Sequence, residues 1–113
     1  MRIEVKGRNL TVGEELRARV EKKFDKVARQ VSPLAAMEVE LCEERNPAIR
    51  ESQLAAATLH LKGVTLRAEE RSDDMVHSIN MVAEDLARQV KRHRDKRRKR
   101  RQATKAEPPI TAS

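Results

Sequence analysis

Apolar and polar residues alternate along four short stretches of the chain. Residues 2–6 show this period-two pattern, which is typical of a strand with one buried face. The same alternation over 37–43 and 64–69, and a less regular run over 53–62, predicts three further strands. Gly63 supplies a tight turn between the last two, so we expect a hairpin there. Consecutive alanines leave the register of the third strand open.

Two other segments carry apolar residues at spacings of three and four, the pattern of amphipathic helices. The first stripe consists of Leu16, Val20, Phe24, Val27 and Val31, and the second of Met75, Ile79, Val82, Leu86 and Val90. Thr11 and Glu14 match a capping box that would begin the first helix, and Ser32-Pro33 would end it. The run 72–74 offers N-cap oxygens for the second helix.

The resulting order, β-α-β-β-β-α, predicts an α+β fold. Each amphipathic helix must bury one stripe, and a four-stranded sheet can cover both helices with one face while its other face meets solvent. The first β-α-β unit should make its two strands parallel, whereas the remaining pairs should be antiparallel. We therefore expect a two-layer sandwich over residues 1–90, with both helices on one side of a mixed sheet.

The positive charge of the chain is concentrated near its C-terminus. The 113 residues include 25 Lys and Arg against 18 Asp and Glu, a net charge of +7. Residues 91–101 alone carry +8, whereas residues 1–90 carry −1. Segment 91–101 is basic on every side of a helical wheel, so we expect a basic extension of the last helix, and 102–113 to be a disordered tail. A strongly basic segment at one end of a nearly neutral domain indicates a polyanionic partner.

The rest of the composition excludes several classes of function. Phe24 is the only aromatic residue, so readers of single-stranded nucleic acid that stack bases on aromatic rings are excluded. The single Cys42, the scattered histidines and the separated glycines predict no metal site, no cofactor and no enzyme activity. No signal peptide or apolar span is present in the sequence, which favours a cytoplasmic protein without a membrane partner.

Basic side chains on both helices lie away from the apolar stripes. If the helices share one side of the sheet, these side chains and the basic extension form one cationic surface that can hold the phosphates of folded RNA. An ordinary solvated face remains an equally good interpretation for any single basic residue of the first helix. The candidate RNA-binding residues are Arg17, Lys22, Lys23, Lys26, Arg29, Arg71, Arg88, Lys91, Arg92, Arg94, Lys96, Arg97, Arg98, Lys99, Arg100 and Arg101.

Several segments resemble one known family. The run VTLRAEERSDDM at 64–75, followed by 79–80 and then LARQV at 86–90, is similar to the ribosome hibernation-promoting factors, also described as ribosome-associated translation inhibitors. The opening IEVKGRNLTV at 3–12, with LR at 16–17 and KFDKV at 23–27, is similar to the first strand and helix of the same family. The resemblance covers about residues 1–100.

This resemblance implies a fold similar to double-stranded-RNA-binding domains. It also implies a site on the small ribosomal subunit, in the decoding region of its rRNA, where the protein would compete with mRNA and tRNA. We expect no small-molecule substrate and a monomer off the ribosome. The chain departs from the family pattern at Val76, where an aromatic residue is usual, and at Asp85, where lysine is usual. The C-terminal dimerisation domain of longer members is absent from this sequence.

Two other classes of protein compete with this interpretation. One is a general basic RNA- or DNA-binding module without ribosome specificity, which the neutral body and the motif at 64–75 disfavour. The other is a ribosome-rescue peptidyl-tRNA hydrolase, which needs a Gly-Gly-Gln loop to position water at the ester. The sequence contains no adjacent glycines, so this second class does not fit.

Overall fold

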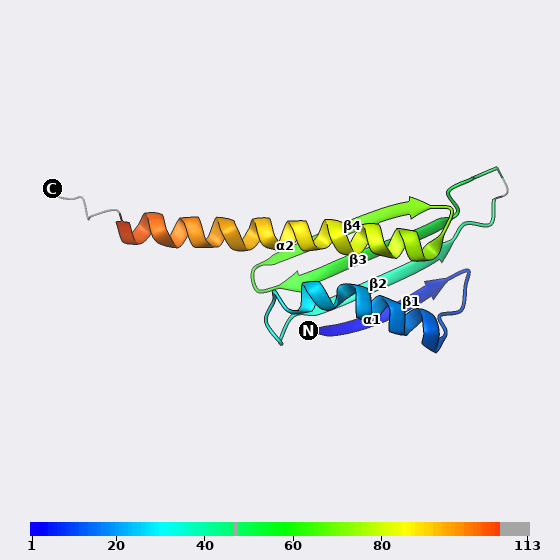
Figure 1. The fold of residues 1–113 in the computed structure, drawn as a ribbon, viewed down its shortest axis with the longest axis horizontal. Coiled ribbons are helices and arrows are strands. Elements are labelled where there is room, and N and C mark those ends of the chain that lie inside the picture. The colour runs from blue at the N-terminus through cyan, green and yellow to red at the C-terminus, as the bar shows by residue number, and fades with distance from the viewer. Residues whose placement is uncertain (47, 107–113) are drawn as a thin grey trace.

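The computed structural model describes residues 1–46 and 48–106, with side chains described through Lys99. Its elements in order are β1 (Arg2–Arg8), α1 (Glu14–Ala28), β2 (Ala36–Glu43), β3 (Gln53–Leu61), β4 (Val64–Ser72) and α2 (Met75–Ala106). Both helices cover the same face of the sheet, and α2 continues well beyond it (Figure 1). The predicted two-layer α+β sandwich is confirmed.

The four strands form one sheet in the order β1-β2-β3-β4. β1 is parallel to β2, whereas β3 is antiparallel to both β2 and β4, as the sequence predicts. The register aligns Val5 with Val39, Val39 with Ala57, and Ala57 with Ala68. These four buried side chains form a row beneath the helices, which settles the register of the alanine-rich third strand.

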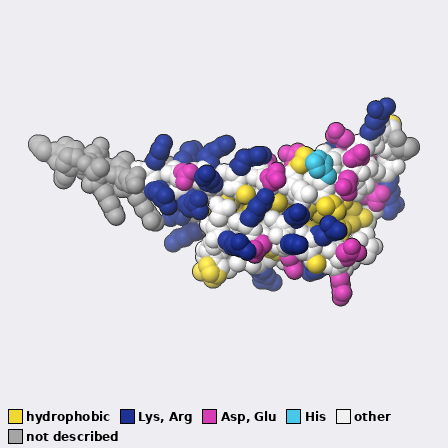
Figure 2. Space-filling view, in the orientation of Figure 1, with side chains coloured by type: hydrophobic (Ala, Val, Ile, Leu, Met, Phe, Trp, Pro, Cys, Tyr) yellow, Lys and Arg dark blue, Asp and Glu magenta, His cyan; other side chains and the backbone are white. Residues whose placement is uncertain are grey.

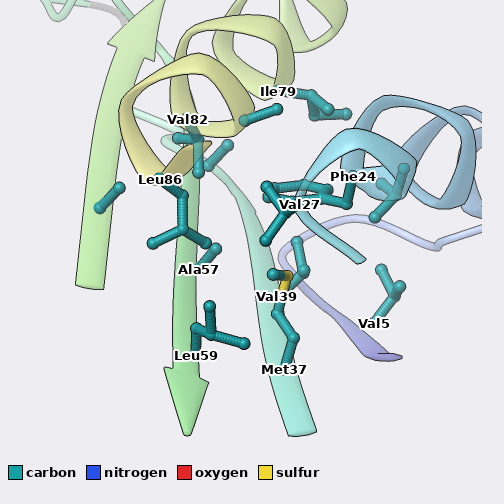
Figure 3. Packing of buried hydrophobic residues seen from close by; sticks show 14 of the residues in the cluster. Val5, Phe24, Val27, Met37, Val39, Ala57, Leu59, Ile79, Val82 and Leu86 are labelled. Atoms are coloured by element: carbon teal, nitrogen blue, oxygen red, sulfur yellow. The ribbon is translucent and has the colours of Figure 1, made fainter. Parts of the chain in front are cut away.

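The core lies between the sheet and the two helices. In Figure 3 the labelled side chains of α1 and α2 point toward those of the strands. The middle of each predicted stripe is buried, whereas Leu16, Val31 and Met75, at the stripe ends, are only partly buried against the core. The largest fully buried side chains are Phe24, Met37, Leu41, Leu59, Ile79 and Leu86. Both helices are therefore held by the faces that the sequence assigns to them.

Replacing Phe24 with alanine should lower the free energy of unfolding by about 3–5 kcal/mol, because the ring is fully buried and its loss leaves a cavity. Urea denaturation followed by circular dichroism measures this loss. Leu34→Ala is the control, since Leu34 is 94% exposed and should change stability by less than about 0.5 kcal/mol. Equal effects of the two substitutions would contradict the assigned core.

The predicted capping box is wrong. α1 begins after Gly13, whose extended backbone forms the N-cap without any side-chain hydrogen bond. The preceding loop folds back onto β1: Asn9 has a φ of 63°, and a Cβ at Gly7 would lie 2.5 Å from the Leu10 carbonyl oxygen. This turn leaves Thr11 outside the N-cap position, so its hydroxyl does not serve the helix.

α1 also ends earlier than predicted. Its last residue is Ala28, four residues before Ser32, because the final turn tightens. The amide of Gln30 donates to the carbonyl of Val27 at 3.0 Å, a three-residue spacing that closes the helix. Val31 then packs partly buried against the core after the helical backbone has ended.

The predicted N-cap of α2 is confirmed. The amide of Val76 donates to Asp74 Oδ1 at 3.2 Å, which satisfies one amide at the helix start. β4 extends to Ser72, beyond the predicted 64–69, because its last residues still pair with β3. Ser78 Oγ lies 2.6 Å from Ser72 Oγ and donates to the carbonyl of Gln53 at 2.7 Å. These buried contacts fasten the start of α2 to the end of the sheet.

α2 has 32 residues and includes the whole predicted basic segment 91–101. Val90 is the last buried side chain among those described through Lys99, and the molecule extends over 68 × 29 × 18 Å because the rest of the helix projects outward. At 1.5 Å per residue, segment 91–106 is about 24 Å long. Residues 102–106 of the expected tail continue this helix, and 107–113 lie outside the described residues.

Candidate nucleic-acid interface

The open face of the sheet compensates its own charges. Alternate residues of all four strands point away from the helices there, and basic groups stand beside acidic ones. The described ion pairs on this face are Lys6–Glu4 at 3.8 Å, Arg8–Glu40 at 3.9 Å and Arg67–Glu69 at 3.2 Å, and His60 Nε2 lies 3.6 Å from a Glu38 carboxylate oxygen. Arg67 also donates to Thr58 Oγ1 at 3.1 Å. A surface on which basic and acidic side chains neutralise one another attracts a polyanion only weakly.

The helix side has a different charge arrangement. Figure 2 shows dark blue Lys and Arg side chains along the projecting helix and onto the face between α1 and α2, while acidic side chains gather toward the opposite end. Among the described ion pairs, Arg29–Asp25 at 2.7 Å is the one on this side. Most of these cations therefore lack a carboxylate within ion-pair distance, and their field is available to phosphates.

The helical repeat explains the positions of the predicted site residues on α1. Successive residues turn by about 100°, so Lys22 and Arg29 lie opposite the stripe that contains Val20 and Phe24. Lys22, Lys26, Arg29 and Arg17 are exposed. Lys23 lies closer to the buried stripe and is half-buried, so less of its side chain is accessible to a partner.

On α2, Arg88, Lys91 and Arg92 are exposed, and the basic series continues along the part of the helix that projects beyond the domain, residues 91–106, which we call the projection. A shallow depression of about 410 Å³, which we call the outer trough, follows one side of the helix. It is lined by Arg88, Lys91, Arg92, Asp95, Lys96 and Lys99. Arg100 and Arg101 belong to α2, but their side chains are outside the described set. With five basic residues and one aspartate in its lining, the outer trough is electropositive.

A second depression lies where α2 leaves the domain, and we call it the end hollow. It has a volume of about 340 Å³ and is lined by apolar Val31, Leu61 and Val90 together with basic Lys62, Arg94, Arg97 and Arg98. Sequence reasoning missed Lys62. The signal for it is the hairpin turn at Gly63, which the topology brings to the same end as the start of the projection.

Arg71 is separated from the other predicted residues. It lines a hollow with Asp73 and His77 near the N-terminal end of α2, whereas the cationic series begins at Arg88. Arg19 was also missed: it is exposed on α1, on the same side of the helix as Lys26 and two turns before it. The structure thus brings together the helix-side residues and leaves Arg71 at another end.

Other chemistry is not indicated in the part of the chain that the structure describes. No group of three His, Cys, Asp or Glu side chains there is placed to hold a metal ion. Cys42 is a half-buried free thiol that alternates with the buried Leu41. None of the described helices is long and apolar enough to cross a membrane.

The sequence over residues 3–98 matches the family model of the sigma 54 modulation protein and S30EA ribosomal protein. The chain therefore belongs to this family. It is 36% identical over 96 residues to a ribosome hibernation promotion factor of Staphylococcus aureus, covering 83% of this chain and 48% of that protein. A ribosome hibernation promotion factor of Picosynechococcus is 29% identical over 97 residues, with 85% and 50% covered. The chain spans about half the length of these relatives, whose names denote ribosome hibernation promotion factors.

Solved structures agree with the fold. The N-terminal domain of Protein Y from Thermus thermophilus superposes with a TM-score of 0.72 at 28% identity, covering 82% of this chain and 99% of that domain. A ribosomal subunit interface protein from Coxiella burnetii gives a TM-score of 0.68 at 20% identity, covering 84% and 99%. The resemblance seen in the sequence is thereby confirmed at the level of family and fold.

Proposed function

We propose that this protein is a ribosome hibernation factor that binds the small ribosomal subunit in the decoding region and blocks mRNA and tRNA by occupying their space. The helix side, formed by α1, α2 and the projection, is the RNA-binding surface. The protein acts in the cytoplasm, as a monomer before it binds, and without a cofactor or a chemical step.

The observation that carries this proposal is the difference in charge pairing between the two faces. Three of the four described ion pairs between a lysine or arginine and a carboxylate lie on the open face of the sheet, while the helix side and the projection carry most of the basic groups that have no such partner. Counterion release favours RNA binding by these unpaired basic groups, because each phosphate that pairs with a protein cation frees condensed salt ions.

The shape of the molecule supports RNA as the partner. Phe24 is fully buried, so no aromatic ring of the described surface can stack on a base, and recognition must use phosphates and the form of the folded RNA. A packed domain with a projection about 24 Å long can fill a channel between parts of a large RNA assembly. The names of the related proteins, which refer to ribosome hibernation, agree with this partner.

Small subunits loaded with a short mRNA and initiator tRNA should bind the protein at least about tenfold more weakly than empty subunits, because the ligands would overlap. Fluorescently labelled protein sedimented with subunits through sucrose measures this change. Large subunits and naked rRNA are the controls. Tight binding that mRNA and tRNA leave unchanged would contradict the decoding-region site. Equal affinity for naked rRNA would favour a general RNA-binding module.

A further inference from the structure

The end hollow combines an apolar surface with a concentration of positive charge. Three segments that are distant in sequence meet there: the chain after α1, the β3–β4 turn, and α2 from Val90 onward. Val31, Leu61 and Val90 also pack in or against the core, so their positions are set by the fold. The described residues that line the hollow include no aspartate or glutamate. Its chemistry therefore fits an anion that also carries an apolar surface.

The helical repeat places basic side chains on the side of α2 that lines this hollow. Three, four and seven residues beyond Val90, the same side of α2 carries His93, Arg94 and Arg97. The face that buries apolar side chains inside the domain thus becomes cationic at the point where α2 passes the end of the sheet. His93 is half-buried there, whereas Arg94 and Arg97 are exposed.

A nucleotide has both properties that the hollow requires. Its base offers a flat surface that packs on aliphatic groups and stacks on guanidinium planes, and its phosphates pair with arginine. In a duplex the base is stacked inside the helix, so only an unpaired nucleotide can present base and phosphate together. The volume of about 340 Å³ lies at the lower end of the range for small-ligand sites.

We propose that the end hollow binds one unpaired nucleotide of the partner RNA. Its base packs against Val31, Leu61 and Val90, and its flanking phosphates pair with Arg94 and Arg97. This inference rests on the proposed function and adds to it a preference for RNA that offers an extruded base. The outer trough, on the other side of α2, binds backbone phosphates without such a preference.

An RNA hairpin with one bulged nucleotide should bind about tenfold more tightly than the same hairpin fully paired, since removing some tens of Å² of base and aliphatic surface from water is worth about this factor. Fluorescence anisotropy at fixed salt measures both affinities. An abasic bulge should bind like the paired hairpin. The ratio of the two affinities is the decisive quantity, because the general attraction between protein and RNA charge cancels in it.

Two matched double variants separate the hollow from overall charge. Arg94→Gln with Arg97→Gln should bring the ratio close to one. Arg92→Gln with Lys96→Gln removes the same charge from the outer trough and should weaken both hairpins equally, leaving the ratio unchanged. A ratio that falls equally in both variants would overturn the assignment to the end hollow.

Methyl NMR tests the contact directly. Adenosine monophosphate should shift the methyl resonances of Val31, Leu61 and Val90, whereas ribose 5-phosphate, which lacks the base, should not. If the wild-type protein shows neither these shifts nor a preference for the bulge while still binding small subunits, the nucleotide site is overturned and the proposed function stands. If it binds no small subunits, the proposed function fails as well.

Discussion

Replacing Lys22, Lys26, Arg88 and Lys91 with glutamine should weaken binding to small subunits by about 10²–10³-fold at moderate salt. Each lost phosphate contact removes roughly 0.7–0.9 of a released counterion, so the slope of log affinity against log salt should become shallower by about 3. Titrations over a range of salt concentrations measure both quantities. These side chains are exposed and make none of the described ion pairs, so the fold should tolerate the change.

The open face of the sheet supplies a control of equal charge. Arg2, Lys6, Arg8 and Arg67 are also exposed, and three of them have a carboxylate beside them. Their replacement by glutamine should leave the salt slope within about 1 of the wild-type value, although the net charge falls by the same amount. Equal losses for the two sets would show that total charge, and not the helix side, determines binding.

The sequence predicted those parts of the fold that depend on burying a continuous face. The alternation of apolar and polar residues identified the strands, and spacings of three and four identified the helical stripes around Phe24 and Leu86. Both patterns were informative because each of these faces is buried in the core. The errors lie at element ends. The start of α1 depends on a loop in which Gly7 lies beneath the Leu10 carbonyl, and no local pattern of polar residues reports such an approach.

The candidate site was predictable to the same extent. Helical spacing alone places Lys22 and Arg88 away from their stripes, so the sequence could assign them to a solvent face. It could not place Arg71 at a different end from the cationic series, nor Lys62 beside the projection. The positions of Arg71 and Lys62 depend on where the β3–β4 hairpin turns and where α2 leaves the sheet. Both features belong to the tertiary structure and cannot be deduced from local sequence patterns.

Ending the chain at Arg94 should give a folded domain that has lost most of its affinity for the small subunit. The deletion removes seven basic and two acidic residues, a net charge of +5. It keeps one helical turn beyond Val90, the last of the described side chains that is buried, so the core and the helix around it stay intact. The melting temperature should therefore remain within a few degrees of that of the full chain, as measured by circular dichroism.

The loss of affinity follows from the six basic residues at 96–101. If all six pair with phosphates, the salt slope falls by about 4 to 5, and affinity near physiological salt falls by about 10³-fold or more. A full-length variant with Lys96, Arg97, Arg98 and Lys99 replaced by glutamine separates charge from length. Its salt slope should fall by about two thirds of the decrease expected for the truncated protein, although the helix is still present. A truncated protein that retains the wild-type slope would show that the projection does not bind RNA, and non-cooperative melting would show that it supports the fold.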